Sequence, residues 1–309
     1  LDVAWLKKTR TLKGIVVAGC LVQRFGEDVL KELPEVDAVV GVGGALKIVE
    51  AVEAAYNGKK YSFIPDPMEI PLEGSRVVTT PEHFAYLKIA EGCDNKCAYC
   101  VIPSIRGSFR SRPILDIIEE AEDLAAMGIK ELCLVAQDTT AYGKDIFGLY
   151  ALDSLLKELS KIKGIEWIRL LYCYPERITD SLIEEIATNP KVVKYIDMPI
   201  QHISSDVLRR MNRRDTSESI RNVVKKLRER IPDVVLRTTV ITGFPGETEK
   251  DFNELLAFVK EARFERLGAF EYSREEGTAA YDMPDQVHAK KKKSRRDTIM
   301  RAQMKIHED

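Results

Sequence analysis

The sequence has no long apolar run and no excess of either charge. No stretch approaches the roughly 18 consecutive apolar residues of a membrane-spanning helix, so no membrane partner is expected. The formal net charge is −2, whereas dedicated nucleic-acid binders usually carry a basic excess, so nucleic acid is not expected as the main substrate. One basic run, KKKSRR at 291–296, is interpreted as the solvated face of a helix.

The sequence also lacks the marks of export. Its beginning, LDVAWLKKTR, is neither a signal peptide nor a transit peptide. Six cysteines in 309 residues, without a secretory signal, predict a cytoplasmic protein with thiols and no disulfide scaffold. A hydrophobic content of 45% and a charged content of 31% are typical of a globular protein with a core. Because no initiator Met is present, we expect a fragment of a longer chain.

Residues 1–60 alternate strands with helices and predict a small βαβα domain. A proline-containing segment over 61–80 predicts a linker to the rest of the chain. The first domain is read from a strand over 12–22, a helix in EDVLKEL, a strand in VDAVVGV and a helix in ALKIVEAVEAAY.

Residues 81–286 alternate strand and helix six times, which predicts right-handed crossovers and a parallel sheet. Six units are too few for a closed eight-stranded barrel, so the expected α/β fold is an open, TIM-like partial (βα)6 barrel. A C-terminal helix is expected over 287–309. The predicted strands are FAYLKIA, ELCLVAQ, WIRLLY, KYIDMPI, VVLRTTVI and LGAFEY.

Polar residues follow these strands, and the loops at the carboxyl ends of barrel strands carry chemistry in folds of this kind. The sequence therefore predicts a site at this rim of the barrel. The residues placed there are Cys93, Gln137, Asp138, Arg169, Gln201, Gly243 and Phe244.

Half of the cysteines lie in one short loop, EGCDNKCAYC. Cys93, Cys97 and Cys100 have the spacing CxxxCxxC. Structural zinc needs four ligands, and catalytic zinc needs three and a water. Soft thiolates also select iron–sulfur clusters, and three thiolates leave one iron of a four-iron cluster open to a substrate or cofactor. Ligand number and spacing leave both zinc and iron–sulfur open.

The loop resembles the signature of the radical S-adenosylmethionine (SAM) enzymes, in which an aromatic residue, here Tyr99, precedes the third cysteine. The partial barrel expected above is also that superfamily's fold. The resemblance implies that Cys93, Cys97 and Cys100 hold a 4Fe–4S cluster whose open iron binds SAM.

Longer stretches resemble the methylthiotransferases of this superfamily. The resemblance implies a second 4Fe–4S cluster in the full-length chain, with Cys20 in GCLVQRFGE as one ligand. The other two ligands would lie upstream of Leu1, and a C-terminal TRAM module would follow residue 309. This chain is then expected to cleave SAM but not to insert sulfur. The matching stretches are GCDNKCAYCVIPSIRGSFRSRP, LVAQDTTAYGKD, PIQHISSDVLRRMNR, TTVITGFPGETEKDF and EYSREEGTAAY.

Two branches of that family have different substrates. RimO-type enzymes modify the β-carbon of an aspartate in a small-subunit ribosomal protein, and MiaB-type enzymes modify an adenosine of tRNA. The sequence AQDTTAYG, with Ala136 and Asp138, resembles the RimO type, as do IPSIRG and EEGTAAY. The MiaB type is the alternative, and an external electron donor is implied for either.

The resemblance also implies roles around SAM, with no catalytic side chain beyond the cluster ligands. Tyr99 would contact the adenine, Gln137 and Asp138 the methionine part, and Arg169 the carboxylate. Gln201 would contact the ribose, and the adenine pocket would include Ile241, Gly243 and Phe244. The alternative to an enzyme is a binding module in which the cysteines hold a structural zinc ion. It would be colourless, whereas a 4Fe–4S protein is brown.

Overall fold

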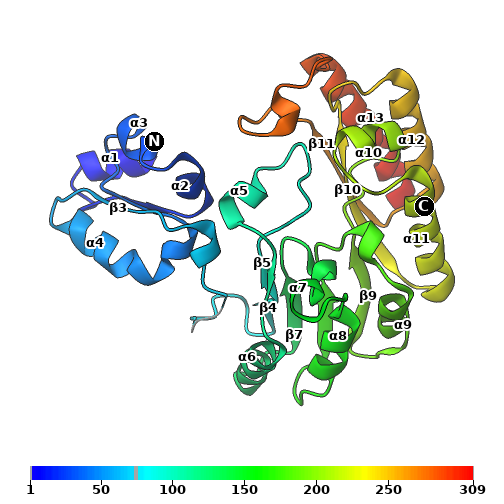
Figure 1. The fold of residues 1–309 in the computed structure, drawn as a ribbon, viewed down its shortest axis with the longest axis horizontal. Coiled ribbons are helices and arrows are strands. Elements are labelled where there is room, and N and C mark those ends of the chain that lie inside the picture. The colour runs from blue at the N-terminus through cyan, green and yellow to red at the C-terminus, as the bar shows by residue number, and fades with distance from the viewer. Residues whose placement is uncertain (1, 73–75, 309) are drawn as a thin grey trace. The chain divides into compact units, whose positions relative to one another are not determined.

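The structure is a computed structural model that describes residues 2–72 and 76–308. The chain forms two compact units, both drawn in Figure 1. The smaller unit contains the chain before the gap at 73–75, together with Glu91–Asp94 and Val101–Ser108. The larger unit contains the remaining described residues. Among the described residues, no helix combines the length and the apolar character that crossing a bilayer requires.

The smaller unit is built on a parallel three-stranded sheet in the order β1-β2-β3. The central strand is buried along its whole length, as expected for a parallel strand covered on both faces. Val39 packs with Val22 and Val29 on one face, and Ala38 packs with Ala51 on the other. The elements are α1 (Asp2–Lys8), β1 (Val16–Ala18), α2 (Cys20–Phe25), α3 (Asp28–Glu32), β2 (Ala38–Val40), η1 (Val42–Lys47), α4 (Ile48–Tyr56), β3 (Tyr61–Phe63), η2 (Pro67–Glu69) and α5 (Ile102–Arg106).

The larger unit contains the six predicted strands in one parallel sheet, ordered β11-β10-β9-β8-β7-β4. Figure 1 shows the long helices along one side of this sheet. In chain order the elements are β4 (Phe84–Lys88), β6 (Arg110–Ser111), α6 (Ile114–Ala126), β7 (Glu131–Val135), η3 (Thr139–Ala141), α7 (Lys144–Phe147), α8 (Leu152–Ser160), β8 (Trp167–Leu170), η4 (Pro175–Arg177), α9 (Asp180–Thr188), β9 (Val192–Asp197), α10 (Ser205–Arg210), α11 (Ser217–Arg230), β10 (Val235–Thr242), α12 (Glu249–Ala262), β11 (Arg266–Glu271), η5 (Ala279–Tyr281) and α13 (Ala289–Glu308), with β5 (Ala90–Glu91) leading into the cysteine loop.

Successive side chains of each strand face opposite sides of the sheet. One side, the outer face, packs against the helices and contributes Leu87, Leu132, Ile168 and Leu236 to the main core. The other side is more polar and less buried, as the strict alternation along β10 shows. We call it the inner face and define it by Tyr86, Glu131, Cys133, Trp167, Arg169, Tyr195, Asp197, Arg237, Thr239, Arg266, Gly268 and Phe270.

Two boundaries predicted from the sequence are wrong. The linker expected over 61–80 begins later, because Tyr61–Phe63 forms β3 and pairs with β2; residues 73–75 of it lie outside the described chain. The strand expected over 12–22 is confined to Val16–Ala18. Gly19, with φ 108°, turns the backbone and Cys20 begins a helix instead. The C-terminal helix expected over 287–309 corresponds to α13.

Candidate active site at the cysteine loop

The first cysteine of the loop is fixed by backbone contacts in the smaller unit. The N–H of Cys93 donates to the carbonyl oxygen of Gly107 at 3.1 Å. Gly92 has φ 81°, and a Cβ there would lie 2.1 Å from the carbonyl oxygen of Ser108. Both the left-handed conformation and the close backbone approach require glycine. Gly92 therefore sets the path of the chain into Cys93.

The other two cysteines lie in the larger unit. The N–H of Cys100 donates to the carbonyl oxygen of Cys97 at 3.0 Å, and the N–H of Ala98 donates to Met211 at 2.9 Å. The side chain of Asn212 donates to the carbonyl oxygen of Lys96 at 2.8 Å. The loop backbone is therefore held by the segment that follows α10.

The six cysteines differ in exposure. Cys20 is exposed, and the three cysteines of the loop are partly exposed. Cys133 and Cys173 are buried, and burial raises their pKa values to about 11 and about 12. Since metals bind the thiolate form, these two remain core residues, and the other four are candidate ligands.

The donor set of the loop fits an iron–sulfur cluster that has one iron without a protein ligand. Cys93, Cys97 and Cys100 supply three thiols within one short segment. In the described ranges, 2–72 and 76–308, no three His, Cys, Asp or Glu side chains meet as the ligands of a single metal ion. A four-iron cluster binds each thiolate through a different iron, so its ligands surround a cube and do not meet at one point.

Gln137 and Asp138 follow β7 at its carboxyl end, and their side chains differ in function. The carboxylate of Asp138 accepts hydrogen bonds from Asn95 at 2.8 Å and Thr140 at 2.6 Å, and it pairs with Arg177. Asp138 therefore anchors the cysteine loop through Asn95. Oε1 of Gln137 is buried and accepts no hydrogen bond from the described residues. A buried acceptor of this kind is a place for a ligand donor.

Three residues predicted beside the adenine lie together. Tyr99, Ile241 and Phe244 belong to one apolar cluster of the larger unit. The rings of Tyr99 and Phe244 meet edge to face, with centroids 6.4 Å apart. Together they form an apolar wall next to Cys100, of the kind that suits a flat heterocyclic ring.

Gly243 and Phe244 are held by a buried carboxylate. Their backbone N–H groups donate to Oε2 of Glu247 at 2.5 and 3.3 Å. Glu247 pairs with Arg295 at 2.8 Å, and both side chains are almost fully buried. Burial raises the pKa of Glu247 despite the nearby guanidinium of Arg295. Glu247 therefore shapes this loop, and Thr248 caps α12.

Strained backbone conformations occur at three loops of the rim. Lys96, Tyr172 and Gln201 have φ values of 42°, 59° and 67°. Left-handed conformations are costly for residues other than glycine and often occur at functional sites. Two backbone hydrogen bonds to β10 hold Gln201 in this conformation. Its N–H donates to the carbonyl oxygen of Thr239 at 2.9 Å, and its carbonyl oxygen accepts from the N–H of Ile241 at 2.8 Å.

Arg169 does not join the other predicted SAM contacts. Its Nε lies 2.5 Å from Glu131, the first residue of β7, and its guanidinium lies 5.1 Å from the ring centre of Tyr195. The side chain therefore points toward the amino end of the strands, whereas Gln137 and Asp138 follow the carboxyl end of β7. Arg169 belongs to the inner face and is not placed to bind a SAM carboxylate beside them.

A buried cation near Cys97 was missed in the sequence. Arg213 donates to Asp215 at 2.8 Å and lies 4.1 Å from the ring centre of Tyr174. Burial opposes its charge, but Tyr99, Tyr174 and Asp215 outweigh this effect and raise the pKa of the guanidinium. Arg213 lies in RRMNRRD, which looks like an exposed basic segment. The structure therefore fixes a buried positive charge that interacts electrostatically with Cys97.

Cys20, predicted as a ligand of a second cluster, begins α2 in the smaller unit. Nη2 of Arg106 lies 3.4 Å from its sulfur. Nη1 of Arg106 pairs with the buried carboxylate of Glu91 at 3.2 Å. The role of Cys20 stays a prediction.

Comparison with known structures shows the fold. Residues 87–259 match the model of the radical SAM superfamily. A radical S-adenosylmethionine methyltransferase, TsrM, from Kitasatospora setae superposes with a TM-score of 0.67 at 15% identity, over 87% of this chain and 57% of that one. HemN, the coproporphyrinogen III oxidase of Escherichia coli, superposes with a TM-score of 0.54 at 19% identity, over 72% and 51%. The predicted partial barrel is confirmed.

Comparison with curated proteins shows which family of the superfamily the chain resembles. A protein from Acetivibrio thermocellus named ribosomal protein uS12 methylthiotransferase RimO is 53% identical over 97% of this chain and 68% of its own length. Proteins of the same name from Geobacter sulfurreducens and Desulforamulus reducens are 51% and 50% identical, each over 99% of this chain and 69% of its own length. The chain therefore belongs to the radical SAM superfamily and, within it, to the RimO family of methylthiotransferases.

Proposed function

We propose that this enzyme adds a methylthio group to the β-carbon of an aspartate in the small-subunit ribosomal protein uS12. The observation that carries this proposal is the identity of 53% over 97% of the chain to a protein named as a uS12 methylthiotransferase. Asp138, in the sequence AQDTT that resembles this branch, also anchors the cysteine loop through Asn95. Its cofactors are a 4Fe–4S cluster and SAM.

Cys93, Cys97 and Cys100 would hold the cluster as thiolates. When bound, the cluster and SAM supply one-electron chemistry, which removes a hydrogen atom from a carbon that is too weakly acidic to lose a proton. Oε1 of Gln137 accepts a hydrogen bond from the bound ligand, since no described residue donates to it. Arg213 keeps a buried positive charge that interacts electrostatically with Cys97.

Tyr99 and Ile241, which are partly exposed, would contact the adenine, and the fully buried Phe244 packs behind them. Glu247 and Arg295 hold the Gly243–Phe244 turn in place. Gln201 contacts the ribose from a strained backbone conformation. In this assignment, the protein supplies orientation and a dry pocket, and the cofactors supply the reactive species.

A second cluster belongs to the same proposal, with Cys20 as one of its ligands. The thiol of Cys20 is exposed and lies next to the guanidinium of Arg106. An external donor supplies the electrons. The enzyme works in the cytoplasm, where its ribosomal substrate is made, and nucleic acid is not its main substrate.

Mass spectrometry of candidate substrates tests the proposal. The full-length enzyme, which has all the ligands expected for the second cluster, is reconstituted anaerobically with iron and sulfide and given SAM, dithionite and either a uS12 loop peptide or a tRNA anticodon stem-loop. We expect a thiomethyl group on the aspartate of the peptide and none on the RNA. Cys97→Ala is the control and should give no product. A product on the RNA alone would contradict the substrate assignment and leave the cluster assignment intact.

A further inference from the structure

The inner face of the six-stranded sheet carries two arginines that the proposed chemistry does not use. Arg169 lies on β8 and Arg237 on β10, on either side of β9. Nε of Arg169 lies 2.5 Å from Glu131, and Nη1 of Arg237 lies 2.6 Å from Asp197. The two arginines are thus fixed by acids on neighbouring strands.

The acids are buried while the arginines remain accessible. The side chain of Asp197 is 1% exposed, and that of Arg237 is 43% exposed. In the second pair, the side chain of Glu131 is 12% exposed and that of Arg169 is 30% exposed. Each ion pair uses a single nitrogen of its guanidinium. The positive ends of these pairs therefore face outward from the inner face.

A third arginine, Arg266, does not add free positive charge to the inner face. It is aligned with Arg237 in the register of β10 and β11, but its guanidinium donates to the carbonyl oxygen of Glu265 and lies 3.2 Å from Nδ1 of His307 on α13. Two guanidinium groups therefore stand against the two carboxylates of Glu131 and Asp197. Because both acids lie beneath the arginines, an incoming ligand meets positive charge first.

Large aromatic side chains surround these cations. Tyr86, Trp167 and Phe270 are 45%, 52% and 60% exposed, although the residues next to them, such as Leu87 and Ile168, are fully buried. Exposed aromatic groups gathered on one surface indicate a binding site, because water solvates them poorly. Charged and aromatic groups therefore share this face, a combination that suits a peptide.

We propose that the inner face binds the aspartate-bearing loop of the substrate and that Arg237 selects its carboxylate. This inference rests on the proposed function and names a residue that would determine its specificity. A guanidinium matches a carboxylate through two parallel hydrogen bonds. Asp197 holds Arg237 in place before the substrate arrives, which reduces the entropy lost on binding.

A double-mutant cycle measured by calorimetry tests this inference. The reconstituted enzyme is titrated with a uS12 loop peptide carrying aspartate and with the same peptide carrying asparagine. We expect the asparagine peptide to bind the wild type about ten- to hundredfold more weakly, because a charged hydrogen-bond pair is lost. Arg237→Lys keeps a charge beside Asp197 but loses the two parallel hydrogen bonds to the ligand, so most of this discrimination should be lost.

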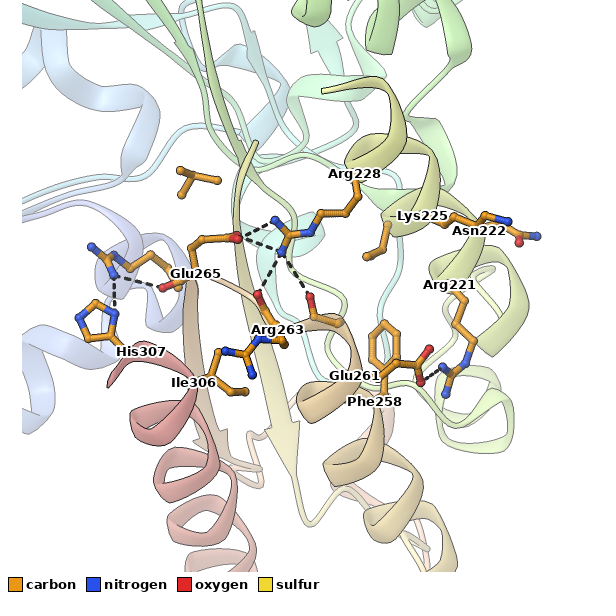
Figure 2. A pocket seen from close by; sticks show the side chains of 14 residues that line it. Arg221, Asn222, Lys225, Arg228, Phe258, Glu261, Arg263, Glu265, Ile306 and His307 are labelled. Atoms are coloured by element: carbon orange, nitrogen blue, oxygen red, sulfur yellow. Dashed lines mark hydrogen bonds and ion pairs between the residues drawn. The ribbon is translucent and has the colours of Figure 1, made fainter. Parts of the chain in front are cut away.

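Two further variants guard against unfolding and indirect effects. Asp197→Asn combined with Arg237→Met leaves no buried charge without a partner, and it should also fail to discriminate between the peptides. Arg221→Met removes the same charge from α11, where Arg221 pairs with Glu261 at the cavity of about 930 Å³ shown in Figure 2. This control should discriminate as the wild type does.

The outcomes separate this inference from the proposed function. If the wild type binds and thiomethylates the peptide while the Arg237 variants still discriminate, the inference is wrong and the proposed function stands. If the Arg237 variants raise the KM for SAM in peptide-free cleavage and still discriminate, the arginine serves SAM. If the wild type neither binds nor modifies the peptide, the proposed function fails and the inference fails with it.

Discussion

The two faces of the six-stranded sheet use the same strands for different purposes. On the outer face, Leu132 and Leu236 are fully buried against the helices. On the inner face, Trp167 and Phe270 remain more than half exposed on strands of the same sheet. Burial of apolar surface stabilises a fold, whereas exposed aromatic and charged groups are available to a ligand. Alternation along each strand thus separates stability from recognition.

Ion pairs show the same division. Glu247 and Arg295 lie on the helix side and are almost completely buried. The pair of Asp197 and Arg237 on the inner face is buried only on its acidic side. A fully buried pair has no freedom to exchange partners, while a half-exposed arginine can take a second carboxylate. The comparison can be tested by changing one face at a time.

Removal of Arg295 should have the largest effect on stability. Arg295→Met leaves the buried carboxylate of Glu247 without its partner, which should lower the free energy of unfolding by about 3–5 kcal/mol. Urea denaturation would measure the change. Arg296→Met is the matched control, because Arg296 pairs with Glu271 and Asp297 near the surface and should cost under about 1 kcal/mol. If the two variants lost equal free energy of unfolding, the distinction between the buried ion pair and the surface ion pairs would be wrong.

Truncation of a single leucine tests the outer face. Leu236 is fully buried on β10, so Leu236→Ala should cost about 2–5 kcal/mol through lost contacts and a cavity. Chemical denaturation of the variant gives the value. A loss below 1 kcal/mol would mean that the outer face does not carry the core as described.

Acid should weaken the fold through His202. Its Nδ1 accepts the N–H of Ser204 at 3.0 Å, and burial lowers its pKa to about 3 from 6.5. Between these values the unfolded chain binds a proton that the folded chain does not, so stability falls as pH decreases, by about 1.4 kcal/mol per unit.

Unfolding measured from pH 7 to pH 4 in wild type and His202→Asn tests this expectation. The variant should lose less stability per pH unit than the wild type. His83→Asn, at an exposed position, should follow the wild-type slope. A wild-type slope retained by His202→Asn would assign the acid sensitivity to other groups.

The smallest effect on stability is expected on the inner face. Phe270 is 60% exposed, so Phe270→Ser should change the free energy of unfolding by no more than about 0.5 kcal/mol. Binding of the uS12 peptide should nevertheless weaken. Thermal unfolding and calorimetry of the same sample would compare the two properties. A large loss of stability would show that Phe270 belongs to the core.

The sequence predicted what depends on local pattern. Six apolar runs separated by amphipathic helices were sufficient to predict the barrel strands, and the spacing of Cys93, Cys97 and Cys100 located the candidate site. The strand Tyr61–Phe63 was missed because only three residues pair in it, too few to show an alternation.

Features that depend on tertiary contacts were not accessible in the same way. Arg169 follows the expected strand, but its direction is set by Glu131 on the neighbouring strand. Arg213 is buried only because Tyr174 and Asp215 surround it. Tyr174 is too far from Arg213 in the sequence for this contact to be predicted. Asp215 is only two residues away, but that closeness does not reveal that the pair is buried.

Fluorescence of Trp167 tests the division between the two faces most directly. The chain has two tryptophans, so Trp5→Phe leaves Trp167 on the inner face as the single reporter. The account predicts that the uS12 peptide shields Trp167 from acrylamide, and that the peptide with asparagine does so only at higher concentration. Tight binding seen by calorimetry with no change in the quenching of Trp167 would contradict it.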